Sequence, residues 1–219
     1  MIYAFFRLLG LTLGYPLQLL FFKRRTFYES GKRSRSLRRG GKLVIMNHYN
    51  MFDYVLTSFI VYPRKLNVVA SEDPFKKPLF RFGMKFFGAI QANRLTKNMK
   101  FIDECARVIN DRRQLVMIFP EGRNTPDGEM HPFKPSYLVI AYRAGCPIVP
   151  AVTDGVYHPF RRTSVIIGDE IDVSPFFTSS GRTPTRDELA EANDFVFNKM
   201  LELRALLEEK KQEKRRKKK

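Results

Sequence analysis

A histidine and an aspartate five residues apart, His48 and Asp53, are the side chains whose types and spacing could do chemistry. The apolar run 43–46 before them is typical of a buried parallel strand, and the apolar run 54–60 after them is typical of a packed helix. His48 would then lie at the carboxyl end of a strand, where open α/β sheets place their ligands. If the turn folds back, the Asp53 carboxylate accepts a hydrogen bond from Nδ1–H and leaves Nε2 free to act as a base. An ordinary surface or helix-capping pair is the alternative.

A base with an orienting carboxylate is part of a catalytic triad, and here no serine or cysteine is supplied beside it. The nucleophile for such a pair would be a hydroxyl group on the substrate. Three further strand ends are expected to reach the same region. These ends are Arg94, the last residue of the strand 88–94, the segment 120–125 after the strand 115–119, and Pro150 after the strand 147–149.

Strands and helices alternate along the chain, which is typical of an α/β fold with a parallel sheet. The long helix 185–209 begins at Thr185, and Glu188 three residues later completes a capping box. We therefore predict an α/β domain with a mixed, largely parallel sheet flanked by helices. Its other strands are expected at 43–46, 66–70, 88–94, 115–119 and 147–149, with a late strand or hairpin at 164–167 and 171–173, and its other helices at 54–60, 75–87, 99–112 and 135–144, the last capped by Gly145.

The chain has 219 residues, which suits one well-buried domain, and a formal net charge of +17. That charge is concentrated at the two ends: residues 23–42 carry +8, residues 210–219 carry +7, and residues 43–209 carry only +1. Basic ends on a nearly neutral body favour nucleic acid or an anionic membrane surface as a partner. We divide the chain into an apolar anchor with a basic flank, 1–42, a domain, 43–209, and a solvated basic tail, 210–219.

The N-terminal segment 1–22 is almost entirely apolar and contains Pro16. Its uncharged part, 8–22, would be about 22 Å long as a helix, shorter than the roughly 30 Å hydrocarbon core of a bilayer. Pro16 favours two short helices or a re-entrant hairpin over one continuous helix. We expect a helical membrane anchor, with the basic cluster 23–25 holding the body at the cytoplasmic face of the cell membrane. A helix packed in the core of the domain is the alternative.

The cysteines and histidines are few and scattered. The two cysteines lack the spacing of a zinc site or a disulfide framework, which favours a reducing compartment. The spread of the three histidines argues against a metal site. These residues are Cys105, Cys146, His48, His131 and His158.

Four short blocks follow one another along the chain. They are Asn47-His48 with Asp53, Gly88 to Arg94, Phe119-Pro120-Glu121-Gly122 with Thr125, and Ile148-Val149-Pro150-Ala151. In this order the blocks resemble those of the glycerolipid acyltransferase family, and within it the lysophosphatidate (1-acylglycerol-3-phosphate) acyltransferases. The resemblance covers about residues 40–155, and the segment 133–147 also resembles the family's intervening helix.

This resemblance implies transfer of an acyl chain from acyl-CoA or acyl-acyl-carrier-protein to the sn-2 hydroxyl of lysophosphatidate, forming phosphatidate in phospholipid biosynthesis. His48 would take the hydroxyl proton and Asp53 would hold the imidazole, without an acyl-enzyme and without a bound cofactor or metal. The expected partners are the lysophospholipid, the thioester donor and an anionic membrane surface, and not nucleic acid. The implied substrate-binding residues are Asn47, Arg94, Glu121, Gly122, Arg123 and Thr125.

More specific expectations follow for some of these residues. Backbone N–H groups near Gly122 would stabilise the oxyanion, and Arg94 and Arg123 would bind the acceptor phosphate. Glu121 would order the loop or bind the glycerol, or it would be a turn residue paired with an arginine. The family usually has arginine second after the glycine of the third block, where this chain has Asn124. Because an arginine binds a phosphate only in a defined geometry, this shift leaves another lysophospholipid or a lipid alcohol open as the acceptor.

Two non-catalytic functions are also open. A nucleic-acid-binding protein would account for the basic ends, but the positive charge avoids the body and the sequence contains no recognised nucleic-acid-binding module. A membrane-bound pseudoenzyme that recruits partners would account for the altered third block.

Overall fold

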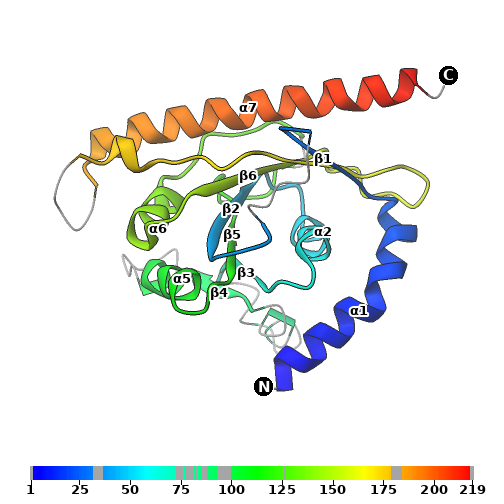
Figure 1. The fold of residues 1–219 in the computed structure, drawn as a ribbon, viewed down its shortest axis with the longest axis horizontal. Coiled ribbons are helices and arrows are strands. Elements are labelled where there is room, and N and C mark those ends of the chain that lie inside the picture. The colour runs from blue at the N-terminus through cyan, green and yellow to red at the C-terminus, as the bar shows by residue number, and fades with distance from the viewer. Residues whose placement is uncertain are drawn as a thin grey trace.

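A computed structural model describes residues 2–31, 37–72, 76, 81, 83–84, 88–92, 100–125, 127–178 and 184–217. In this part of the chain, seven strands form one sheet in the order β1-β7-β6-β2-β5-β3-β4 (Figure 1). Neighbouring strands are parallel except for β6 and β7, so the sheet is mixed and largely parallel, as predicted. The strands are β1 Arg25–Tyr28, β2 Lys42–Met46, β3 Leu66–Ser71, β4 Ile90–Ala92, β5 Leu115–Ile118, β6 Ile148–Thr153 and β7 Ser164–Ile167.

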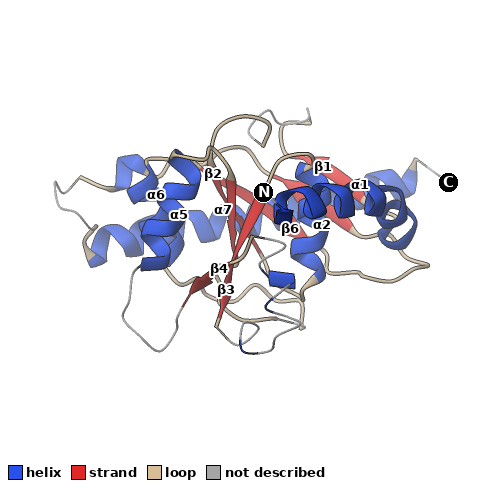
Figure 2. Cartoon of the chain, turned by 90° about the horizontal axis from the view of Figure 1, so that it is seen from below, coloured by secondary structure: helices blue, strands red, loops and turns tan. Residues whose placement is uncertain are grey.

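Helices cover both faces of the sheet (Figures 1 and 2). Strand β2 shows why: Leu43 and Ile45 pack in one apolar cluster with α5, α6 and α7, whereas Val44 and Met46 pack in another with α2. All four side chains are fully buried, which is why this strand is an uninterrupted apolar run. The helices are α1 Ile2–Phe22, α2 Phe52–Val61, α5 Lys100–Asn110, α6 Ser136–Ala144 and α7 Arg186–Arg216, with the short 3-10 helix η1 Ser174–Phe176.

Strand β6 continues through Pro150, so the predicted end of the strand at this residue is wrong. Pro150 O accepts a hydrogen bond from Gly168 N at 2.8 Å. The N–H and C=O of a strand residue point to the same side, so the missing N–H of Pro150 faces β7 and not β2. Because β6 and β7 pair from Ala151 and Ile167 onward, Pro150 lies at the end of this ladder, where its missing N–H removes only one terminal hydrogen bond.

Helix α1 is continuous through Pro16, so the predicted break into two short helices or a hairpin is wrong. Its packing against the body compensates for the hydrogen bond that the proline removes. Leu11, Gln18 and Phe22 are buried at helical spacing, and α1 approaches the ring of Phe59 on α2 closely. Within the described residues, no helix combines the length and the hydropathy that crossing a bilayer requires.

Strand β1 lies inside the segment that we expected to be only a basic flank. It pairs in parallel with β7 at one end of the sheet. A four-residue strand that begins with arginine gave no apolar signal in the sequence. The basic end of α7 lies beside it, with Lys214 Nζ 5.4 Å from the centre of the Phe27 ring. The two basic ends of the chain therefore lie close together.

Helix α7 begins at the predicted capping box, in which the side chains of Thr185 and Glu188 each accept a backbone hydrogen bond from the other residue. It then continues to Arg216, beyond the start of the expected tail at residue 210. Lys211 helps to hold this extension on the body, because its Nζ is 3.1 Å from the buried carboxylate of Asp154. The charged residues after 210 are therefore partly packed, where we expected a solvated segment.

Two predictions fall on residues that the structure does not describe in full. Only residues 76, 81, 83 and 84 of the aromatic-rich segment 75–87 are described, and Arg94 lies outside the described residues.

Candidate active site

The sequence blocks meet at the carboxyl edge of the central strands. Strands β5 and β6 flank β2 on its two sides and run parallel to it, so the loops after all three leave the sheet at one edge. His48 follows β2, Glu121 follows β5 and Thr153 ends β6. This placement matches the convergence of strand ends that the sequence predicted.

His48 and Asp53 are hydrogen-bonded, as their spacing predicted. Nδ1 of His48 is 2.9 Å from Oδ2 of Asp53. Asp53 lies in the first turn of α2 and is fully buried, whereas the His48 side chain is 17% exposed. With Nδ1 as the donor to the carboxylate, Nε2 is left as an acceptor, which is the tautomer that a general base needs.

Three further donors hold the Asp53 carboxylate. The backbone N–H groups of Tyr49 and Asn50 donate to Oδ2 at 2.7 and 2.8 Å, and the O–H of Tyr157 donates to Oδ1. A buried charge requires such partners, because it has lost its hydration. Tyr157 was missed by the sequence analysis: it lies 104 residues from Asp53, so no local pattern links the two.

The third sequence block holds the backbone of His48 on both sides. Glu121 Oε1 accepts from His48 N at 3.1 Å, and Glu121 Oε2 accepts from His131 N at 3.0 Å. Thr125 donates to His48 O from its backbone N at 2.7 Å and from Oγ1 at 3.0 Å. Both Glu121 and Thr125 are 3% exposed. Glu121 therefore orders the loop, which is one of the roles expected for it, and Thr125 also holds the histidine backbone; a contact of either residue with substrate stays a prediction.

Asn47 also has a structural task, and its expected contact with substrate stays a prediction. Its Nδ2 donates to Thr153 O at 3.0 Å, and its Oδ1 accepts from Thr153 N at 2.9 Å. The side chain is 5% exposed, and both ends of its amide are in use. Asn47 therefore ties the end of β2 to the end of β6 and so fixes the position from which the His48 loop departs.

Gly122 forms the tight turn after β5. Its φ of 67° is readily adopted only by glycine, and its N–H donates to Phe119 O at 3.0 Å. The N–H of Gly122 itself is thus engaged in closing the turn, and the role of backbone N–H groups near Gly122 in stabilising the oxyanion stays a prediction. The turn places the Phe119 ring flat against the His48 imidazole, with 3.8 Å between the ring centres and 13° between the planes. This stacking restricts rotation of the histidine.

Arg123 is exposed near the histidine and is held by a short chain of side chains. Its Nη2 donates to Nδ1 of His131 at 2.9 Å, and Nε2 of His131 donates to Oδ2 of Asp127 at 3.0 Å. The hydrogen bond from His131, helped by the backbone N–H of Glu129, lowers the pKa of the Asp127 carboxyl. A guanidinium carries five N–H donors, so the bond to His131 leaves others for an anion.

A cavity of about 290 Å³ lies beside His48. Most of its wall is apolar, and its polar part includes Arg123 and Asn124. A second cavity of about 310 Å³ shares the wall at Phe119 and Gly122 and is also lined by Lys134. Apolar space next to a base and a cation suits a ligand with an apolar chain and an anionic head. The apolar lining of the first cavity comprises Met51, Tyr54, Val55, Val68, Val69, Ala70, Met84 and Phe119.

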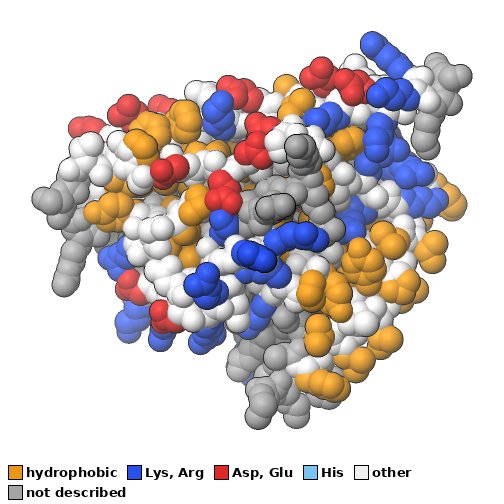
Figure 3. Space-filling model, viewed as in Figure 1, with side chains coloured by type: hydrophobic (Ala, Val, Ile, Leu, Met, Phe, Trp, Pro, Cys, Tyr) orange, Lys and Arg blue, Asp and Glu red, His pale blue; other side chains and the backbone are white. Residues whose placement is uncertain are grey.

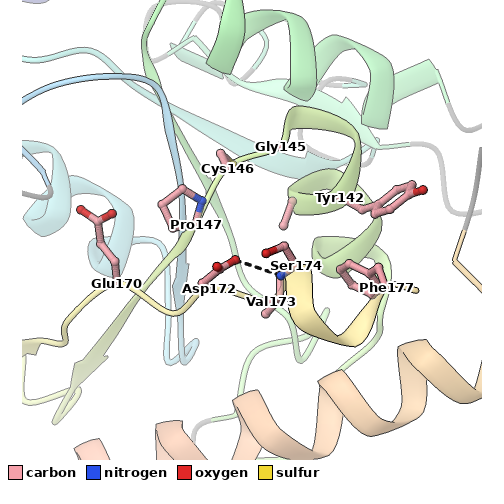
Figure 4. Close-up of a pocket in the computed structure, with 10 residues that line it drawn as sticks. Tyr142, Gly145, Cys146, Pro147, Glu170, Asp172, Val173, Ser174 and Phe177 are labelled. Carbon is pink, nitrogen blue, oxygen red and sulfur yellow. Dashed lines mark hydrogen bonds between the residues drawn. The ribbon is translucent and has the colours of Figure 1, made fainter. Parts of the chain in front are cut away.

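A cavity of about 570 Å³ lies at the opposite edge of the sheet (Figure 4). It is lined by the turn before β6 and by residues after β7, where the backbone N–H of Ser174 donates to Asp172. Burial raises the pKa of the Cys146 thiol in its wall to about 11, so the thiol is protonated at neutral pH. The residues that line this cavity include none of those that surround His48, so its volume does not mark the active site.

A sequence model described as "Acyltransferase" matches residues 28–154, which include every described residue discussed around His48 except Tyr157. The putative 1-acyl-sn-glycerol-3-phosphate acyltransferase acl-2 of Caenorhabditis elegans is 31% identical over 115 residues, which are 52% of this chain and 40% of that protein. The 1-acyl-sn-glycerol-3-phosphate acyltransferase of Haemophilus influenzae is 29% identical over 178 residues, which are 74% of this chain and 69% of that protein. The match to a coconut relative also spans only 40% of that protein.

The crystal structure of the 1-acyl-sn-glycerophosphate acyltransferase PlsC from Thermotoga maritima is similar in fold. The superposition has a TM-score of 0.61 at 18% sequence identity and covers 92% of this chain and 79% of that one. The family match extends over more than half of the chain, and it contains the histidine, the aspartate and the strands that bring them together. The chain therefore belongs to the acyltransferase family.

Proposed function

We propose that this acyltransferase moves an acyl chain from an acyl thioester to the sn-2 hydroxyl of lysophosphatidate and so forms phosphatidate. One observation carries the proposal: the His48 imidazole is oriented by the buried Asp53 and lies in the wall of a mostly apolar cavity. The names of the nematode and Haemophilus influenzae relatives support lysophosphatidate as the acceptor.

In the proposed mechanism, the acceptor hydroxyl is the nucleophile. Nε2 of His48 takes its proton as the oxygen attacks the thioester carbonyl, and Asp53 stabilises the resulting imidazolium. The tetrahedral intermediate then collapses, the carbon–sulfur bond breaks, and the thiolate leaves. The imidazolium returns the proton to the sulfur, so the enzyme ends the cycle unchanged and carries no acyl group.

The polar groups around the cavity suggest where the two substrates bind. Arg123 is our candidate for the acceptor phosphate, and Arg94 stays a second candidate. The apolar cavity beside His48 has the character that an acyl chain needs. The adjoining cavity at Lys134 is our candidate for the arm of the donor, acyl-CoA or acyl-acyl-carrier-protein.

The position and the hydrogen bond of Arg123 also favour a second class of acceptor. Arg123 is one residue earlier than the family pattern and already donates to His131, so it can accommodate a head group other than a phosphate monoester. Another lysophospholipid or a lipid alcohol is therefore the alternative acceptor.

A panel of acceptors offered with each thioester donor decides between these two. We expect turnover with lysophosphatidate to exceed that with lysophosphatidylcholine and monoacylglycerol. Arg123→Ala should raise KM for lysophosphatidate by about 10- to 100-fold, because a charge-assisted contact is lost, and should change KM for monoacylglycerol far less. Arg112→Ala, which removes an exposed cation near the opposite edge of the sheet, is the matched control. Equal turnover of all acceptors would rule out lysophosphatidate as the specific substrate.

We also propose that α1 docks on the membrane without crossing it. The large exposed apolar side chains gather over this helix (Figure 3). Leu13, Leu17 and Leu20 are 63%, 64% and 71% exposed. Met51 is 64% exposed and also lines the cavity at His48, so the apolar surface continues toward the active site. A lipid acceptor could then reach the base without leaving the interface.

Basic residues from both ends of the chain adjoin this apolar surface. Burial lowers the pKa of Arg25, and the neighbouring charges of Arg162 and Arg215 lower it further, which shows how closely these cations gather. Such a cluster would attract the anionic lipids of the cytoplasmic leaflet. The position of this basic cluster therefore supports the same orientation of the domain on the membrane that the exposed leucines of α1 indicate.

Replacing Leu13, Leu17 and Leu20 together with serine should weaken binding to anionic vesicles by about 100-fold, because each leucine contributes roughly 1 kcal/mol when partly inserted. Flotation or sedimentation with phosphatidylglycerol vesicles measures this. A double variant, Phe195→Ser and Leu201→Ser, removes exposed apolar side chains from α7 and should bind like the parent. Complete release of the parent by high salt alone would contradict apolar docking.

A further inference from the structure

The loop after β6 supplies a hydrogen-bond donor to the catalytic aspartate. This donor lies outside the segment that the family model matches. Tyr157 lies beyond the matched segment 28–154, and its O–H donates to Oδ1 of Asp53. Oδ2 of the same carboxylate accepts from Nδ1 of His48 and from two backbone N–H groups. Tyr157 therefore holds the carboxylate oxygen that does not contact the imidazole.

The position of the Tyr157 ring is fixed from two sides. The ring packs edge-on against Phe22, at the end of α1, with 5.8 Å between the centres and 77° between the planes. Its centre lies 5.7 Å from that of Phe52, in the first turn of α2. Thr163 fixes the loop, because its N donates to Phe22 O at 3.0 Å and its Oγ1 donates to Val156 O at 2.6 Å. The hydroxyl is thus presented to Asp53 from a rigid support.

The hydroxyl remains a donor at neutral pH. Burial raises the pKa of Tyr157, and the negative charge of Asp53 raises it further. The donors on Oδ2 oppose rotation of the carboxylate about its Cβ–Cγ bond, and the bond from Tyr157 to Oδ1 opposes the same rotation from the other oxygen. With both oxygens held, the plane of the carboxylate is defined.

We propose that Tyr157 is a positioning residue for acyl transfer: its O–H acts with the donors on Oδ2 to hold the plane of the Asp53 carboxylate, and it draws part of the negative charge away from His48. This inference rests on the proposed function, in which His48 is the base. A fixed plane keeps Nδ1 in line with Oδ2 and so keeps Nε2 directed at the acceptor. The shared charge limits how strongly the imidazolium is stabilised, so that it can return its proton to the departing thiolate.

Tyr157→Phe tests this, because it keeps the ring and removes only the O–H. We expect kcat to fall by about 10-fold or more, while KM for both substrates changes by less than about twofold. Without the hydroxyl, the full carboxylate charge faces the imidazolium and stabilises it. The acid limb of the kcat profile should therefore move to higher pH, by about half a pH unit or more.

Tyr137→Phe is the matched control. Tyr137 is fully buried, whereas Tyr157 is half-buried, and the O–H of Tyr137 donates to Asn193 Oδ1 at 3.0 Å, in a contact between α6 and α7. This variant should lower thermal stability and leave the acid limb where it is. A fall in kcat of Tyr157→Phe with an unmoved acid limb would mark a merely structural role and overturn the proposal.

A titration that does not depend on turnover separates this proposal from the proposed function. The imidazole resonances of His48 can be followed by NMR and assigned by their loss in His48→Ala. In Tyr157→Phe their titration midpoint should move to higher pH, and an unmoved midpoint would overturn the role of Tyr157. Failure of the parent to acylate any acceptor would instead refute the proposed function, and the titration would still decide the role of Tyr157.

Discussion

Replacing His48 with alanine should lower kcat by about 10³- to 10⁴-fold, the contribution typical of a well-placed general base. The pair with Asp53, which orients the imidazole as a base, is built into one turn between β2 and α2, so the alanine variant removes this base. The fold should survive, since Glu121 accepts from the backbone N–H of residue 48 and Thr125 donates to its backbone C=O, so neither bond uses the imidazole. Steady-state assays with saturating thioester and acceptor measure the loss, and circular dichroism checks the fold.

His158→Ala is the control for this variant. His158 lies on the exposed loop after β6, where its Nδ1 accepts from Phe160 N. Removing it should leave kcat within about twofold of the parent, as is usual for an exposed residue outside the active site. Activity of His48→Ala within about tenfold of the parent would show that another group is the base.

Replacing Asp53 with asparagine should lower kcat by about 10²- to 10⁴-fold, with little change in volume. The amide can still accept from the imidazole, but it cannot stabilise the imidazolium that forms during attack. It should also destabilise the fold by roughly 1–3 kcal/mol, because the bonds from Tyr49, Asn50 and Tyr157 lose their ionised acceptor.

Kinetics and denaturant unfolding measure the two effects of Asp53→Asn separately. Asp172→Asn, which changes a carboxylate at the opposite edge of the sheet, should leave kcat unchanged. If Asp53→Asn lost stability but kept parental kcat, the aspartate would be a structural residue and the dyad would not be catalytic.

The parts of the fold that the sequence predicted well are those with strong local signals. The run Leu43–Met46 is apolar on both faces because helices cover both sides of the sheet, and it was correctly read as a buried strand. The capping box at Thr185 and Glu188 marked the start of α7 to the residue. The His48–Asp53 contact spans one turn, so its spacing was sufficient to predict it.

The two prolines show where local rules failed. Pro16 and Pro150 were read as breaks, and both lie inside regular elements. In each case the cost of the missing N–H depends on surroundings that are distant in sequence: the packing of α1 on α2, and the end of the pairing between β6 and β7. Propensity alone does not contain that information.

Several residues that we expected to bind substrate have structural contacts that the sequence did not predict. Asn47, Glu121 and Thr125 direct their polar atoms at backbone groups of other loops, which becomes visible only once the strands are placed side by side. Tyr157 gave no signal, because a tyrosine after a strand is ordinary until the chain brings it to Asp53. Contacts between loops, and not the motifs themselves, assemble the site.

Among the partners that charge left open, membership of the acyltransferase family favours a lipid surface, which stays a proposal. Binding to nucleic acid would have explained only the basic ends of the chain. In the folded chain these ends meet beside the exposed leucines of α1, an arrangement of charge and apolar surface that suits anionic lipid.

Direct transfer from thioester to acceptor hydroxyl is tested most directly by rapid quench of the parent enzyme with a radiolabelled acyl thioester. Without acceptor, the proposed mechanism predicts neither a burst of free thiol nor label bound to denatured protein. With lysophosphatidate, one phosphatidate should appear for each thiol released. A burst of thiol matched by an equivalent of protein-bound acyl group would contradict a lone histidine base and show a covalent intermediate.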